Sequence, residues 1–117
     1  SFITRTFTLL TAFSVQSRLT NIGCRTKELA CKELIHQTYD YFGRIDVLIN
    51  CAGISMRALL EDLDLNVIRK VMDVNFWGTV YCSKYALPYL LQSHGTLAGV
   101  ISIAGYIGLP GRTGYAA

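Results

Sequence analysis

Apolar positions in the middle of the chain follow first a helical and then a strand-like pattern. From Thr26 to Phe42 apolar residues recur at spacings that favour one face of a helix, and Gly43 follows where helices commonly end. Residues 46–50 then form a short apolar run, which is typical of a strand buried on both faces of a parallel sheet. We therefore expect a helix from 26 to 42, with Thr26 as its N-cap, and a strand over 46–50.

A longer helix is predicted after this strand. Asp64 is a suitable N-cap, and positions 68, 71, 72, 75, 79, 82 and 86 repeat at intervals of three and four on one face. Pro88 lacks a backbone donor, so we expect the helix to kink or end there. Residues 97–103 then predict a second buried strand, and a glycine-rich loop over 105–114 follows it.

The order helix, strand, helix, strand predicts a parallel α/β sheet. We expect strands 46–50 and 97–102 to be parallel neighbours, with the helix over 64–91 packed against them. The amino-terminal residues 1–22 are harder to assign. Residues 3–10 are rich in Thr, Phe and Ile and favour a strand, and residues 17–24 favour a second short strand.

Composition narrows the class of protein. Of the 117 residues 51% are hydrophobic and 16% charged, which predicts a buried core. The net charge of +3 is spread without a basic block, so a nucleic-acid surface is not predicted, and no apolar run is long enough to span a bilayer. The four cysteines form no Cys-x-x-Cys pair, so we expect no metal site and reduced thiols in a cytoplasmic protein.

Three polar residues are candidates for a catalytic site: Asn75 on the long helix, Ser102 at the end of the second strand, and Tyr115 after the glycine-rich loop. With the segment Asn50-Cys51-Ala52-Gly53, they resemble the short-chain dehydrogenase/reductase family. In that family a serine precedes the catalytic tyrosine by the interval seen between Ser102 and Tyr115.

The resemblance implies an oxidoreductase that transfers hydride between NAD or NADP and a small alcohol or carbonyl compound. A carbonyl that receives hydride needs a proton, which a tyrosine hydroxyl supplies when nearby positive charge lowers its pKa. Carried over from the family, Tyr115 is this acid and Ser102 hydrogen-bonds the substrate oxygen. Asn75 positions the family's catalytic lysine through a water molecule.

The resemblance also implies a wall of the cofactor site at Asn50, Cys51, Ala52 and Gly53. Small side chains there let the backbone approach the ligand. The family has a second asparagine where this chain has Cys51. The sequence leaves NAD and NADP both open.

Two further segments are expected to border the cleft: Ile54, Ser55 and Met56, and the loop over 109–112. Within that loop a solvated surface position is favoured for Arg112 over contact with an anionic substrate. Tyr106 is a second phenol, but it follows Ser102 too closely to match the family's interval.

By the resemblance the fold is a doubly wound, Rossmann-type sheet in three α/β/α layers, truncated at both ends. Residues 23–117 are its central part, and 1–22 stay unassigned. The family's lysine falls four positions after Tyr115, outside these 117 residues, and its Gly-x-x-x-Gly-x-Gly turn does not occur in 1–22. We therefore expect this chain alone to be inactive, and the complete protein to form a homo-oligomer.

Two other function classes compete with the enzyme. A non-catalytic dinucleotide-binding or interaction module derived from the same fold stays open as an alternative. A serine hydrolase is disfavoured because the chain has no Gly-x-Ser-x-Gly turn and neither His36 nor His94 is placed to serve Ser102.

Overall fold

The computed structural model describes residues 9–11 and 24–117, and it contains a parallel sheet. The strands lie in the order β1 (Leu9–Thr11), β2 (Val47–Asn50) and β3 (Thr96–Gly99). β2 pairs in parallel with both neighbours, with Val47 opposite Thr96 and Asn50 opposite Gly99. The prediction that the strands expected over 46–50 and 97–102 are adjacent and parallel is confirmed.

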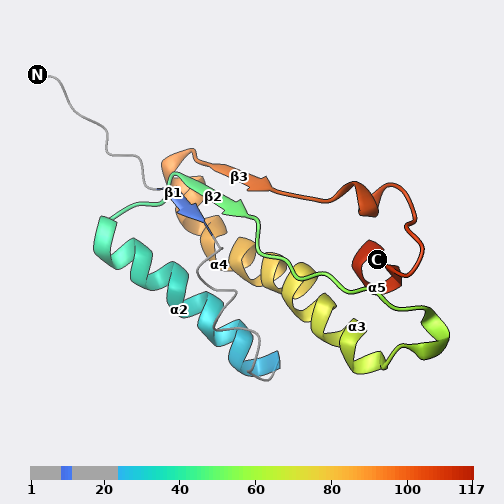
Figure 1. Cartoon of the computed structure of the whole chain (residues 1–117). Helices are drawn as coiled ribbons and strands as arrows, with labels where there is room; N and C mark the ends of the chain where they lie inside the picture. Colours follow the sequence, from blue (N-terminus) through green and yellow to red (C-terminus); the bar gives the residue numbers. More distant parts are fainter. Residues whose placement is uncertain (1–8, 12–23) are drawn as a thin grey trace, which may run out of the picture.

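Helices α2 (Cys24–Phe42) and α4 (Gly78–Ser93) connect these strands and lie on the same side of the sheet (Figure 1). Each is a crossover between parallel strands, which places the molecule in the expected α/β class. Two of the three expected layers, one helical and one sheet, are seen in the part of the chain that the structure describes. The amino-terminal strand predictions fall mostly outside it; of residues 3–10, only Leu9 and Leu10 are described, and both lie in β1.

The carboxyl end of α2 agrees with the sequence-based prediction, whereas its amino end does not. The helix begins at Cys24, so the prediction of Thr26 as N-cap is wrong, as is the strand assignment of Cys24. At the other end Gly43 has φ +73° and donates its N–H to the carbonyl of Tyr39 over 2.7 Å. This left-handed geometry favours glycine and ends the helix as predicted.

The long helix is continuous from α3 (Leu65–Met72) through a π-helical turn (Asp73–Trp77) into α4. The Asp64 carboxylate accepts the N–H of Asn66 over 2.9 Å, which confirms the predicted N-cap. The π turn was not predicted. Pro88 does not end the helix, which runs on to Ser93 because a single missing donor leaves the other turns intact.

The core lies between the two long helices and β2. Its fully or nearly fully buried side chains come from all three elements and from the short loop before β2: Cys31, Ile35, Ile45, Leu48, Cys82, Ala86 and Leu90. Polar contacts also join α2 to the long helix beside this cluster. Lys27, 6% exposed, pairs with Asp73 at 2.8 Å, and the hydroxyl of Tyr85 donates to Glu28 over 2.6 Å. That bond to Glu28 raises the pKa of Tyr85.

The predicted burial of the second strand is wrong in the described residues. β3 ends at Gly99, and Leu97 is 48% exposed, Val100 66% and Ile101 81%. The reason is that α4 covers one face of the sheet, whereas the described residues contain no second helix over the opposite face. The apolar pattern of a strand therefore indicates which of its side chains favour burial, but it does not show whether another element packs over them.

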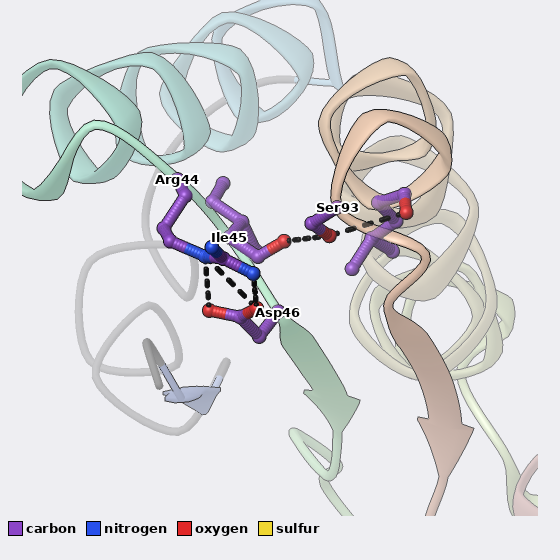
Figure 2. A network of polar contacts seen from close by, with 5 residues as sticks. Arg44, Ile45, Asp46 and Ser93 are labelled. Atoms are coloured by element: carbon purple, nitrogen blue, oxygen red, sulfur yellow. Dashed lines mark hydrogen bonds and ion pairs between the residues drawn. The ribbon is translucent and has the colours of Figure 1, made fainter. Parts of the chain in front are cut away.

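The turn from α4 into β3 is tied closely to the start of β2, as Figure 2 shows. The Ser93 hydroxyl donates to the carbonyl of Ile45 over 2.6 Å, and the N–H of Thr96 donates to the carbonyl of Asp46 over 2.8 Å. The Asp46 carboxylate, 4% exposed as a residue, accepts a bidentate hydrogen bond from Arg44. The bonds from Ser93 and Thr96 fix the end of α4 and the start of β3 against the start of β2.

His94 and Gly95 should respond to substitution in opposite directions. His94 has φ 53°, a left-handed conformation that costs a side chain about 1–2 kcal/mol. His94→Gly should therefore raise the free energy of unfolding by about 0.5–1 kcal/mol, after the loss of backbone entropy is subtracted. Gly95→Ala should lower it by about 1–3 kcal/mol, because the new methyl group would overlap the Asp46 carbonyl and approach Leu90 Cδ2 to 2.9 Å. Urea denaturation monitored by circular dichroism measures both changes, and equal effects of the two substitutions would contradict this account.

The cysteines should differ sharply in reactivity. A hydrogen bond with Cys31 and burial both raise the pKa of the Cys82 thiol, whereas Cys51 is only partly buried. In a Cys24→Ser background iodoacetamide should label Cys51 in the folded chain, with Cys31 and Cys82 reacting at least about 100-fold more slowly. Peptide mass mapping over time tests this, and comparable labelling of all three in native buffer would refute the packing described.

Candidate active site

A cleft of about 710 Å³ opens where β2 and β3 end at their carboxyl sides. Open parallel sheets bind ligands at this edge, because the loops that follow neighbouring strands diverge there. All the residues predicted to take part in catalysis or cofactor binding line this one cleft: Asn50, Cys51, Ala52, Gly53, Asn75, Ser102 and Tyr115. The fold therefore brings together segments that lie up to 65 positions apart in the sequence.

Asn75 is held by two reciprocal hydrogen bonds to the backbone of Ile54. Its Oδ1 accepts the N–H of Ile54 over 2.8 Å, and its Nδ2 donates to the Ile54 carbonyl over 3.0 Å. The residue lies in the π-helical turn, and these two bonds hold its side chain against the loop after β2. Its side-chain amide therefore fixes this loop to the long helix.

Asn50 ends β2 and is 7% exposed. Its Nδ2 donates to the Ser83 hydroxyl on α4 over 3.0 Å, and its carbonyl accepts the N–H of Val100 over 2.8 Å. Its Oδ1 is buried and has no hydrogen-bond partner among the described residues. Since buried acceptors nearly always find a partner, this oxygen marks a place where a water molecule or a ligand group is expected.

Ser102 stands between β3 and a single 3-10 turn (Ile103–Gly105). Its hydroxyl oxygen accepts the N–H of Ala104 over 3.2 Å, which caps this turn and orients the side chain. A hydroxyl that accepts one backbone hydrogen bond still has its own proton to donate. Ser102 can therefore donate to a ligand oxygen in the cleft.

Tyr115 lies in a short helix, α5 (Thr113–Ala116), and is partly buried. Its N–H donates to the carbonyl of Arg112 over 2.9 Å. Gly114 before it packs so closely against α3 that an added Cβ would lie 3.1 Å from Ile68 Cγ1. Tyr106 also lines the cleft, but 89% of it is exposed to solvent. Of the two phenols, Tyr115 is the one whose position the surrounding chain fixes.

Some predictions about the cleft walls were wrong, and some lining residues were missed. Ile54 and Ser55 line the cleft as expected, but Met56 is buried, at 7% exposure, and does not line it. The loop over 109–112 does not line the cleft either; it packs beside residues 55–58 instead. Thr79, Val100 and Ile101 belong to the wall and were not predicted, although their positions next to Asn75 and Ser102 are a usable signal.

The described residues offer no cluster of three or more His, Cys, Asp or Glu side chains that would hold a metal ion. Among them, too, no helix has the length and apolar character needed to cross a membrane. The polar side chains that line the cleft carry amide, hydroxyl, phenol and thiol groups.

Comparison with known proteins gives one consistent family. The family model described as short chain dehydrogenase matches residues 14–117. The 11-beta-hydroxysteroid dehydrogenase A of Arachis hypogaea is 41% identical over 88 residues, which are 74% of this chain and 25% of that protein. The 11-beta-hydroxysteroid dehydrogenase-like 3 of Arabidopsis thaliana is 40% identical over 88 residues, 74% of this chain and 28% of its own length. The chain thus spans about a quarter of the length of these curated relatives.

Solved structures agree with the sequence matches. The NADH-dependent reductase A1-R′ complexed with NAD has a TM-score of 0.73 and 33% identity, over 78% of this chain and 41% of that one. ElxO with NADP bound has a TM-score of 0.74 and 29% identity, over 92% of this chain and 50% of its own. Because the family model matches most of the sequence and the fold agrees with these solved structures, the chain belongs to the short-chain dehydrogenase family.

Proposed function

We propose that this chain forms part of an NAD(P)-dependent oxidoreductase that interconverts a small alcohol and the corresponding carbonyl compound. The observation that carries the proposal is that Asn75, Ser102 and Tyr115 line one cleft together with the segment 50–53. A phenol and a hydroxyl are the groups that proton transfer to a reduced carbonyl requires. A wall of small residues lets a dinucleotide approach the backbone closely. The relatives named above support the same reaction class.

The wall at 50–53 is suited to a nicotinamide cofactor. Ala52 and Gly53 have little or no side chain, so a flat ligand can approach their backbone closely. The buried Oδ1 of Asn50 supplies an acceptor near the same wall. Cys51, where the family has asparagine, keeps the wall compact but is a weaker hydrogen-bonding group. When bound, the cofactor supplies or accepts hydride; NAD and NADP are both bound by solved relatives.

The protein groups then divide the remaining work. Ser102 donates a hydrogen bond to the substrate oxygen and holds it toward the phenol of Tyr115. Tyr115 gives its proton to that oxygen in reduction and takes it back in oxidation. Asn75 acts as a positioning residue, because its side chain is occupied by Ile54 and sets where the loop after β2 lies. It supports the site through this loop rather than by touching the substrate.

We propose a compact alcohol or carbonyl substrate with apolar character. Val100, Ile101 and Tyr106 line the cleft and expose apolar surface, which favours a hydrocarbon body over a highly charged one. The Arachis hypogaea relative is named a hydroxysteroid dehydrogenase, so a hydroxysteroid belongs in any test panel beside short-chain alcohols.

We also propose that the complete protein works in the cytoplasm as a homo-oligomer. The described cysteines Cys31, Cys51 and Cys82 are free thiols, as is usual in reducing compartments. On α4 and the π turn before it, Phe76, Trp77, Leu87 and Leu91 are 41–67% exposed, an apolar surface of the kind that subunit contacts cover.

Tyr115→Phe should abolish most turnover. A chimera in which residues 24–117 replace the corresponding segment of the Arachis hypogaea relative supplies the flanking segments that a complete site needs. In this chimera the substitution should lower kcat by about 100-fold or more, because the ring stays but the proton donor is lost. Cofactor affinity, measured by titration calorimetry, should change by less than about 3-fold.

The matched control is Tyr106→Phe, which removes a phenol from the same cleft. It should leave kcat within about 3-fold, because phenylalanine keeps the apolar ring in the lining and the lost hydroxyl belongs to an 89% exposed residue that is not proposed to transfer the proton. Equal losses in both variants would exclude Tyr115 as the specific acid. A chimera that binds cofactor but never turns over would favour the non-catalytic binding module, and the unextended 117-residue chain serves as the inactive reference.

Asn75 should be tested with one substitution that removes both of its hydrogen bonds to Ile54 and one that removes only the donor. Asn75→Leu removes both hydrogen bonds to Ile54 and should lower the free energy of unfolding by about 1–3 kcal/mol. Asn75→Asp keeps an acceptor for the Ile54 N–H. Amide hydrogen exchange should therefore show that Ile54 loses its protection in the leucine variant and keeps more of it in the aspartate variant. Unchanged protection in both would mean that this contact does not hold the loop.

A further inference from the structure

Arg112 connects two loops on the outer side of the cleft. It lies just before α5 in the loop where the sequence pattern favours a solvated surface position, yet the structure gives it partners on both sides and leaves it only partly exposed. It does not line the cleft itself. Any part it takes in the reaction must therefore act through its neighbours.

On one side Arg112 reaches the segment that follows β2. Its Nη1 donates to the hydroxyl of Ser55, and the adjacent Gly111 carbonyl accepts the N–H of Ala58 over 2.9 Å. Gly111 adopts φ +71°, which a side chain rarely does, and a Cβ added there would lie 3.5 Å from the Ala58 carbonyl oxygen. The loop over 109–112 is thus joined to residues 55–58 by one backbone and one side-chain hydrogen bond.

On the other side Arg112 holds Tyr115. Its guanidinium carbon lies 5.9 Å from the centre of the Tyr115 ring, within the range of a cation–π contact. Its carbonyl accepts the N–H groups of Tyr115 and Ala116, each over 2.9 Å. The same residue therefore contacts the backbone and the ring of the phenol that we propose as the acid.

The segment that Arg112 reaches is itself fixed from the far side. Ile54, next to Ser55, is clamped by Asn75 on the long helix. The contacts consequently form a chain from Asn75 through Ile54 and Ser55 to Arg112 and Tyr115. One end of it lies on the helix, and the other is the phenol ring.

We propose that Arg112 is a positioning residue that sets the orientation of the Tyr115 ring relative to the loop after β2. The effect of Arg112 on turnover rests on the proposed function. Its effect on the orientation of the Tyr115 ring does not, because the ring and the loop are both present in this chain. One guanidinium thus donates to Ser55 and lies within cation–π range of the Tyr115 ring, and a lysine ammonium lacks the planar, forked group that makes both contacts.

The first experiment uses the 117-residue chain and needs no activity. With [13C]-tyrosine labelling, Tyr115→Phe identifies the Tyr115 ring resonance. Arg112→Gln should shift and broaden that resonance and lower the hydrogen-exchange protection of Ala58, while the amides of β2 keep theirs and so show that the fold is intact. Arg112→Lys should give only part of the native shift. Arg57→Gln is the matched control, because it removes an exposed cation beside Gly111 without touching the ring.

The second experiment measures kinetics in the chimera. Arg112→Gln should lower kcat by about 10-fold to 100-fold, the scale expected when a reacting group is misplaced by about 1 Å, and leave the KM for cofactor nearly unchanged. Arg112→Lys should recover part of the loss, and Arg57→Gln should have no effect. A native Tyr115 resonance in Arg112→Gln, or equal effects of Arg112→Gln and Arg57→Gln, would overturn the proposal. If the ring moves as expected but no variant of the chimera turns over, the proposed function fails and the positioning role stands.

Discussion

The arrangement of this molecule depends on the close approach between the end of α4 and the start of β2. Residue 95 must be glycine-sized there, because a Cβ would meet the Asp46 carbonyl, the Ser93 hydroxyl at 2.8 Å and Leu90 Cδ2 at 2.9 Å. Because the two segments approach so closely, the N–H of Thr96 donates to the Asp46 carbonyl and Thr96 lies opposite Val47 in the sheet. This register places Gly99 opposite Asn50. A slip of one residue would move β3 by about 3.3 Å and turn its side chains to the other face. The contacts at the amino ends of the strands thereby determine which residues meet at the carboxyl ends.

Several parts of the fold follow from local chemistry and were predictable for that reason. Asp64 is a strong N-cap and Gly43 accepts a left-handed conformation, so the ends that they form agree with the structure. The start of α2 was misjudged because Thr26 can cap a helix, whereas the helix in the folded chain extends to Cys24. The exposure of β3 was misjudged because an apolar run carries no information about whether another layer covers it.

For the cleft, too, the residues could be predicted from the sequence, whereas their long-range contacts could not. The intervals between Asn75, Ser102 and Tyr115, with the resemblance that they support, were enough to place these residues around one cleft. Their partners were not predictable. The contact of Asn75 with the Ile54 backbone spans 21 positions and that of Arg112 with Ser55 spans 57, and neither pair shows a periodicity or a motif that would signal it. Such contacts depend on the register of the sheet, which the amino-acid pattern constrains only indirectly.

The π-helical turn has a consequence for how this sequence can change in length. Because Gly78 donates to Asp73 five residues earlier, the helix contains one more residue than an uninterrupted α-helix would need between the same two ends. One residue corresponds to about 100° of helical rotation. Deletion of a single residue between Asp73 and Trp77 would restore regular winding and keep Val71 in phase with Cys82, Ala86 and Leu90, all of which are buried, but it would remove the π turn that presents Asn75 to Ile54. A one-residue insertion or deletion elsewhere in the helix would instead rotate the buried face of one half by about 100° relative to the other. Changes of length are therefore compatible with the core only at the turn that carries Asn75.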